Sequence, residues 1–185
     1  MTEKSSIYGS TEIVLRDALG RTKPVWAENR LGKWLRRKFG WDLRDIDIFG
    51  HWADHLAMAN TITNVGHAAA NGRMSNQGAY NPFVNIAIGV GTQGTPATAT
   101  ALASESTTNG GGRGAATATQ VQTTVANDTT NLSKQWTFSG PLAITEEGIF
   151  DSASASSGSM LAYQSFSAIN VVNTDQLTVT HKYQT

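Results

Sequence analysis

The sequence predicts a mainly β protein, with an antiparallel β-sandwich or jelly-roll-like domain preceded by a partly helical N-terminal arm. Residues 1–60 carry 18 charged side chains and four of the five tryptophans, whereas residues 61–185 carry only 10 charged side chains. The second part is rich in Thr, Ser, Asn and Gly, which favour strands and turns. We therefore expect a charged, Trp-rich arm over residues 1–60 and a β-sandwich domain over residues 61–185.

Helical spacing of apolar residues predicts short helices near the start of the chain. The first is expected to begin near Pro24, which suits a helix start, and to stop at Gly40. A second would place four apolar side chains on one face. These are Ile48, Trp52, Leu56 and Ala59. A third short helix is expected over residues 64–71, closed by Gly72.

Alternation of apolar and polar residues predicts strands throughout the second part. The expected strands cover residues 83–88, 115–126, 132–139, 142–145, 149–150, 161–172 and 176–183. A Glu-Glu-Gly corner is expected between the two short strands, and Asn173–Asp175 is expected to form a hairpin turn. Short strands with turn signals at these intervals are typical of sandwiches and jelly rolls.

Composition excludes several classes of function. The 14 basic and 14 acidic side chains cancel, which argues against a protein that binds polyanions through bulk charge. The absence of cysteine excludes disulfides, thiolate metal sites and a cysteine nucleophile. No apolar run reaches the roughly 18–20 residues that a membrane helix needs.

The segment Gly89–Gly94 has the glycine spacing of a dinucleotide-binding loop and follows an expected strand. Such a loop binds phosphate through the N-terminus of a helix that begins there. Residues 95–100 are a poor helix start, and no βαβ unit surrounds them. We interpret this segment as a glycine-rich turn.

Other candidate chemistry is equally sparse. His51 and His55 are four residues apart, the spacing of a helical metal site, but an exposed helix face explains them as well, and the choice stays open. Glu146 and Glu147 are adjacent, so on an extended chain they point to opposite faces and do not converge on one atom. We expect no enzyme, no catalytic residues and no cofactor.

A basic cluster interleaved with aromatic residues follows Pro24. Four aspartates (Asp42, Asp45, Asp47 and Asp54) come soon after it and offset its charge, so a solvated face is as good an interpretation as a binding face. If the surface binds, its Arg and Trp content favours a protein partner over a specific nucleic acid. The expected partner-binding residues are Trp26, Arg30, Lys33, Trp34, Arg36, Arg37, Trp41 and Trp52.

Four sequence segments of the second part, and the order in which they follow one another, resemble a family of small virion proteins from tailed bacteriophages. They are residues 85–92 (NIAIGVGT), 143–150 (AITEEGIF), 160–172 (MLAYQSFSAINVV) and 175–180 (DQLTVT). The resemblance covers about residues 63–185. It implies a structural component of the particle, associated with the capsid or the tail, and no catalytic residues. Residues 1–60 look like an addition outside the shared pattern.

These observations together favour a non-enzymatic capsid decoration or cement protein that binds the shell through its N-terminal arm. Its expected partners are other virion proteins and further copies of itself, with no membrane contact. Lack of cysteine suits assembly in a reducing host cytoplasm before incorporation into the virion. The alternatives are a tail, neck or fibre component, and a module that binds host surfaces or carbohydrate.

Overall fold

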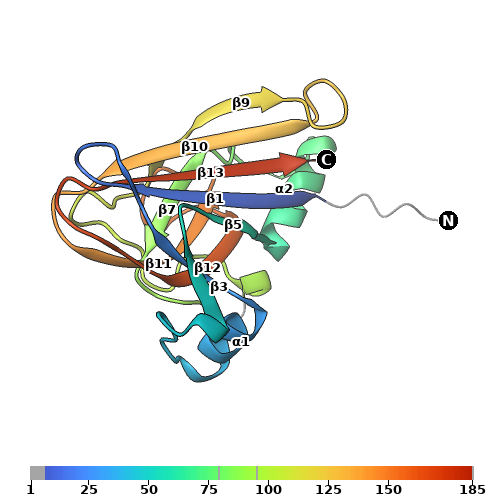
Figure 1. The fold of residues 1–185 in the computed structure, drawn as a ribbon. Helices are drawn as coiled ribbons and strands as arrows, with labels where there is room; N and C mark the ends of the chain where they lie inside the picture. Colours follow the sequence, from blue (N-terminus) through green and yellow to red (C-terminus); the bar gives the residue numbers. More distant parts are fainter. Residues whose placement is uncertain (1–6, 79, 95, 185) are drawn as a thin grey trace.

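The computed structural model describes residues 7–78, 80–94 and 96–184. The protein is mainly β, as predicted, with two antiparallel sheets that pack against each other (Figure 1). The first sheet has the order β2-β1-β13-β10-β9, with β5 also paired to β1. Its strands are β1 (Tyr8–Arg16), β2 (Thr22–Lys23), β5 (Leu56–Ala59), β9 (Thr117–Val121), β10 (Thr129–Thr137) and β13 (Gln176–Gln184).

The second sheet has the order β6-β12-β11-β7-β8. Its strands are β6 (Thr61–Ile62), β7 (Asn85–Gly89), β8 (Gly114–Ala115), β11 (Leu142–Phe150) and β12 (Met160–Val171). Helix α2 (Asn64–Met74) contacts β12, and a short 3-10 turn, η2, covers Pro96–Thr98. Thr63 caps α2 by accepting from the backbone N–H of Gly66, and the helix continues through Gly72 rather than ending there.

The core lies between the sheets. Side chains that alternate along β13 (Leu177, Val179, His181 and Tyr183) are buried, as expected for the alternating strand predicted over residues 176–183. Leu177, Val179 and Tyr183 pack with Ile13 of β1 and with apolar residues of the second sheet. Because neighbouring side chains on a strand face opposite ways, the polar residues between them stay on the outer face.

The predicted division of the chain at residue 60 is corrected by the first sheet. Strand β1 pairs with β13 over nine residues, from Tyr8↔Gln184 to Arg16↔Gln176, and β5 pairs with β1. Charged residues of β1, such as Glu12, occupy its exposed face, while Ile13 and Leu15 are buried. The charge of this segment therefore marks the outer face of a sheet strand and not a separate arm.

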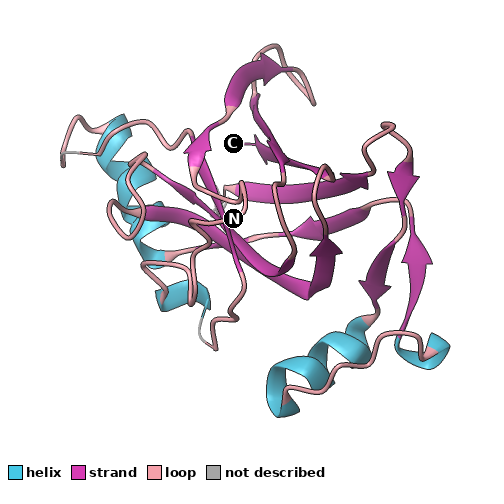
Figure 2. Cartoon of the chain, turned by 90° about the vertical axis from the view of Figure 1, so that its left-hand side faces the viewer, coloured by secondary structure: helices cyan, strands magenta, loops and turns pink. Residues whose placement is uncertain are grey.

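What does project from the sandwich is a smaller unit, Val25–Ala53, which we call the projecting lobe (Figure 2). It consists of a hairpin of β3 (Val25–Glu28) and β4 (Gly50–Ala53) whose connection holds α1 (Arg30–Phe39) and a 3-10 turn, η1 (Asp47–Phe49). Val25 and Trp26 are each 2% exposed and anchor the hairpin to the body.

Two helix predictions are corrected here. The first helix ends at Gly40, as predicted, with a φ of 69°, but it begins at Arg30 because residues 25–28 pair with β4 as a strand. The second predicted helix does not form. Residues 50–53 and 56–59 are strands β4 and β5, and the buried side chains of β5, Leu56 and Met58, follow a period of two.

Three features of the later strands also differ from the prediction. Residues 142–150 form one continuous strand, β11, with a register shift between Ile144 and Glu146 and no corner. The turn at 173–175 exists, but it carries the chain from β12 in one sheet to β13 in the other and is not a hairpin. The strand predicted over 115–126 is limited to β9 and β8.

Neither helix in the described part of the chain is long and apolar enough to span a membrane.

A candidate partner-binding surface on the projecting lobe

Local contacts fix the helix of the projecting lobe in one position. Asn29 caps α1: its side-chain oxygen accepts from the backbone N–H of Gly32 at 2.9 Å, and its amide donates to the carbonyl of Ile48 at 2.7 Å. Gly32 lies against the backbone of Phe49, where an added Cβ would approach the carbonyl oxygen to 2.5 Å. The helix is therefore held against η1 at a distance that only glycine permits.

The lobe is also tied to the sandwich. Leu43 is 8% exposed, and the Arg44 guanidinium donates to the carbonyl of Ala168 on β12 at 3.3 Å. Strand β3 also contacts β12 of the sandwich, and within the lobe Trp26 packs edge-on against Trp52, with ring centroids 5.6 Å apart. These contacts bury one side of the lobe and leave the other side exposed.

The exposed side carries an aromatic cluster, which we define as Trp34, Phe39 and Trp41. The ring centroids of Trp34 and Phe39 lie 5.8 Å apart at right angles, and those of Phe39 and Trp41 are stacked at 5.0 Å. Lys38 places its Nζ 5.0 Å from the centroid of the Trp34 ring, a cation–π contact. Each ring of the cluster is still about half exposed.

Four more large apolar side chains of the lobe are exposed: Leu31, Ile46, Ile48 and Trp52. Apolar residues scattered singly over a surface need no explanation, whereas these are concentrated on one small unit. The lobe comprises only 29 residues, yet it holds seven of the thirteen exposed large hydrophobic side chains among the described residues.

Helix α1 also concentrates positive charge. It contains five basic residues and no acidic one. Arg36 is compensated, because its Nε donates to both carboxylate oxygens of the buried Glu28 at 2.9 and 3.0 Å. Within the described part of the chain, no ion pair neutralises the other four, which we call the basic face: Arg30, Lys33, Arg37 and Lys38.

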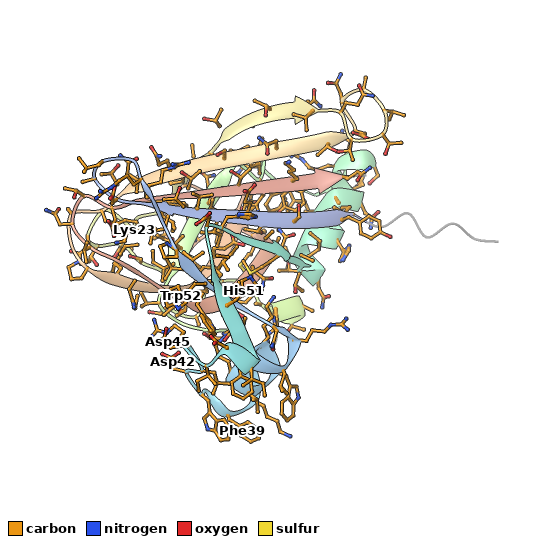
Figure 3. All side chains as sticks on the ribbon, viewed as in Figure 1. Lys23, Phe39, Asp42, Asp45, His51 and Trp52 are labelled. Carbon is orange, nitrogen blue, oxygen red and sulfur yellow. The ribbon has the colours of Figure 1, made fainter. Side chains whose placement is uncertain are left out.

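The aspartates that follow α1 do not cancel the basic face. Asp42 pairs with Arg44 at 2.5 Å, and Asp45 accepts from the indole N–H of Trp52 at 3.0 Å. Asp42, Asp45 and Trp52 lie together along one side of the lobe, whereas Phe39 lies at its far end (Figure 3). Partial burial lowers the pKa of Lys33; Glu28 opposes that effect, and nearby Arg37 and Arg36 add to it.

A groove of about 470 Å³ separates the lobe from the sandwich. Its lobe wall is formed by Arg36, Arg37, Gly40, Trp41 and Asp42, and its sandwich wall by Thr92, Gln93, Gly94, Pro96, Thr145, Phe166, Ser167 and Ala168. A second, shallower hollow of about 420 Å³ is lined by Arg30, Lys33, Trp34, Arg37 and Lys38. Arg37 lines both, so the groove and the hollow adjoin across this side chain.

The structure brings most, but not all, of the sequence-predicted binding residues to this surface. Arg30, Trp34, Arg37, Trp41 and Trp52 are exposed, and Lys33 is half-buried. Trp26 is instead 2% exposed beneath Trp52, and the Arg36 side chain is 12% exposed beside Glu28, although it still lines the groove.

The predicted binding residues did not include Leu31, Lys38 and Phe39, although Lys38 and Phe39 belong to the same basic and aromatic cluster of the sequence. Their signal was their position in the same helical run as Trp34.

The two histidines considered as metal ligands do not share a helix face. His51 lies in β4 and His55 in the turn before β5. Among residues 7–184, with positions 79 and 95 left aside, no group of three side chains is arranged to hold a metal ion.

The adjacent glutamates are buried and have separate partners. Glu146 accepts from the backbone N–H groups of Gly91, Ala103 and Ser104 and from the hydroxyl of Tyr163, which fixes the 91–106 loop. Both ends of that loop are therefore anchored to β11 by one buried carboxylate.

Comparisons with models of protein families, with curated proteins and with solved structures find no match to this chain.

Proposed function

We propose that this protein is a non-enzymatic structural component of a tailed-phage virion, a capsid decoration or cement protein that attaches to the shell through its projecting lobe. The observation that carries the proposal is the exposed aromatic cluster beside the basic face of α1. Aromatic residues and arginine are enriched where protein interfaces gain most of their binding energy. The proposed attachment site is thus a folded unit of residues 25–53, in place of the partly helical arm of residues 1–60 expected from the sequence.

The resemblance to phage virion proteins supports the proposal from another direction. Its four segments fall on β7 with the following turn, on β11, on β12 and on β13, all of them in the sandwich. The projecting lobe lies outside the resembling region. We expect a family of virion proteins to share the sandwich and to differ in the unit that contacts the shell, because the shells of different phages differ.

The other proposed properties follow from this role. The partners are the major capsid protein and further copies of this chain, and the protein is located in the virion. Nucleic acid and membranes are not proposed as partners, since the charge of the whole chain is zero.

The test is attachment to particles after removal of the lobe. Strands β3 and β4 pair up to Glu28↔Gly50, so residues 29–49 are replaceable by a two-residue Asn-Gly turn that suits a hairpin. Glu28→Gln accompanies the replacement, because Glu28 would otherwise lose its Arg36 partner. The purified variant and the intact protein are mixed with phage particles that lack the protein and are sedimented.

The proposal predicts that the intact protein sediments with the particles and that the lobe-deleted variant stays in the supernatant. Its circular dichroism should remain that of a β protein. Normal attachment of the lobe-deleted variant would contradict the proposal. Labelling the protein on whole virions and locating it by electron microscopy separates the capsid position from the tail, neck or fibre position.

A module that binds carbohydrate is the second candidate, and the groove favours it. Trp41, Asp42 and Gln93 combine an aromatic ring with polar groups, as sugar-binding sites do. Saturable binding of the purified protein to host-surface glycans, abolished by Trp41→Ala, would support this function over particle attachment.

A further inference from the structure

We propose that the groove between lobe and sandwich, together with the adjoining hollow along α1, binds one extended acidic segment of a partner protein. This inference rests on the proposed function, because it names the chemistry of the contact through which the lobe attaches. It is carried by charge complementarity and by the shape of the two hollows.

Three cations of this surface have no ion-pair partner within the described part of the chain. Arg30, Lys33 and Arg37 occupy positions i, i+3 and i+7 of α1, which places them on one face of the helix. None of the three has an ion-pair partner among the described residues. Arg36 is fixed by Glu28 in the groove wall, so its charge is held in place without a contribution from the partner.

The dimensions suit an extended chain. Arg30 and Arg37 are seven residues apart, about 10.5 Å along a helix. An extended peptide rises about 3.3 Å per residue and places alternate side chains on one side. Carboxylates at alternate positions lie about 7 Å apart. The three basic residues are separated by rises of about 4.5 and 6 Å along the helix, a difference that their long side chains can span, so a segment of about six to eight residues passes along α1 and enters the groove.

Apolar contacts supply the remaining recognition. Trp34 lines the hollow, and Trp41, Pro96 and Phe166 line the groove. A bound segment with apolar side chains between its carboxylates covers part of these rings. The partner segment is thus acidic and amphipathic, and not simply a run of glutamates.

The same observations favour a protein over a nucleic acid. Affinity for nucleic acid depends on the number of phosphates neutralised, and only four uncompensated cations line this surface. The exposed side of the lobe continues from them into apolar side chains, including Leu31 and Phe39, rather than into further cations.

The test measures binding of end-capped, fluorescent eight-residue peptides to the whole protein by anisotropy at low salt. One peptide carries four Glu and two Leu among Ser residues, and its matched control has Gln at each Glu position. An octamer of thymidine deoxynucleotides is the nucleic-acid probe. The protein is compared with the double variant Arg30→Gln/Arg37→Gln and with a control variant, Arg73→Gln/Lys182→Gln, whose exposed residues lie on α2 and β13.

We expect the Glu peptide to bind at least about tenfold more tightly than the Gln peptide, since carboxylate–guanidinium hydrogen bonds are about twice as strong as neutral ones. The Arg30/Arg37 double variant should lose about five- to tenfold in affinity, and the control variant none. Equal binding of the two peptides, or unchanged binding by the double variant, overturns the inference. Tighter binding of the oligonucleotide than of the Glu peptide also overturns it.

Particle attachment separates this inference from the proposed function. If the protein attaches to particles through the lobe but ignores the Glu peptide, the acidic-segment site is wrong and the proposed function stands. If the Glu peptide binds as expected but the protein does not attach to particles, the proposed function is wrong and the acidic-segment site stands.

Discussion

The carboxylate of Glu147 lies 2.8 Å from the imidazole of His181, and both side chains are fully buried. Glu147 belongs to β11 and His181 to β13, so the contact joins the two sheets through the core. The hydroxyl of Thr11, on β1, lies 3.0 Å from the other ring nitrogen and donates to Glu147 at 3.3 Å. A polar link therefore crosses the apolar interior and fixes how the sheets face each other.

Removing one member of this link should destabilise the protein strongly. The substitution Glu147→Leu leaves a ring nitrogen of the buried His181 without its partner, and an unsatisfied buried polar group of this kind costs about 1–3 kcal/mol. Urea unfolding followed by circular dichroism measures the free energy of unfolding. The exposed neighbour Lys182 supplies a control, Lys182→Gln, which should change it by less than about 0.5 kcal/mol. A loss below about 1 kcal/mol for Glu147→Leu would show that the link has no structural role.

Glu146 should control the order of the 91–106 loop. Its carboxylate accepts three backbone hydrogen bonds from this loop, from Gly91, Ala103 and Ser104. In Glu146→Ala these donors lose their partner, and we expect at least about tenfold faster hydrogen exchange at the amides of residues 103 and 104. Glu12→Ala, an exposed acid of β1, is the matched control. Unchanged exchange in Glu146→Ala would mean that the loop is ordered by other contacts.

The turn before β10 should loosen in acid. Hydrogen bonds from the backbone N–H groups of Thr123, Val125 and Thr124 lower the pKa of Asp128 from 3.8 to about 2. Because the folded pKa is depressed, this contribution to stability is complete above pH 3.8 and is lost as the pH falls toward 2.

Nuclear magnetic resonance of the three turn amides, titrated between pH 5 and about 1.5, should report a midpoint near 2. In Asp128→Asn the same amides should show no transition in this range. A midpoint near 3.8, the ordinary pKa of an aspartate, would contradict the hydrogen bonds assigned to Asp128.

Gly32 should be required for the packing of the lobe. In a helix interior, replacing glycine by alanine normally stabilises the helix, by up to about 1 kcal/mol. Here its Cβ would lie 2.5 Å from the carbonyl oxygen of Phe49, and such overpacking costs about 1–3 kcal/mol. We expect Gly32→Ala to raise hydrogen exchange in residues 25–53 without affecting the sandwich. Gly112→Ala is the control: its Cβ meets no atom within 4 Å, so hydrogen exchange should not change in either region. Slower exchange of the lobe in Gly32→Ala would refute the steric argument.

The strands of the second half were predictable because their side chains alternate without interruption. Leu177, Val179, His181 and Tyr183 mark the inner face of β13 by sequence alone. The stop of α1 at Gly40 was predictable for a similar reason, since a glycine can adopt the positive φ of a helix C-cap without strain.

The elements that sequence reasoning missed depend on partners far away in the chain. In β1 the alternation is present, but charged residues such as Glu12 on the outer face gave the impression of an arm. Glu146 and Glu147 look like turn residues, and they are tolerated inside a strand only because Tyr163 and His181 meet them in the folded protein.

The candidate site was predictable as a region and not in detail. The density of Trp and Arg in residues 26–52 pointed to the lobe. Which of them are exposed could not be deduced, since burial of Trp26 and Arg36 depends on the hairpin with β4 and on Glu28.

The most direct measurement of the central claim is cosedimentation of a surface variant with phage particles that lack the protein. The substitutions Trp34→Ser, Phe39→Ser and Trp41→Ser remove the aromatic cluster, whose rings are about half exposed, so the sandwich should stay folded. Val121→Ser/Val125→Ser/Val172→Ser, which alters three exposed apolar residues of the sandwich, is the control. The account predicts that the control attaches normally and that the cluster variant, with unchanged circular dichroism, loses at least about 90% of attachment, as for a hot spot worth 2 kcal/mol or more. Attachment of the folded cluster variant at the level of the unmodified protein would contradict it.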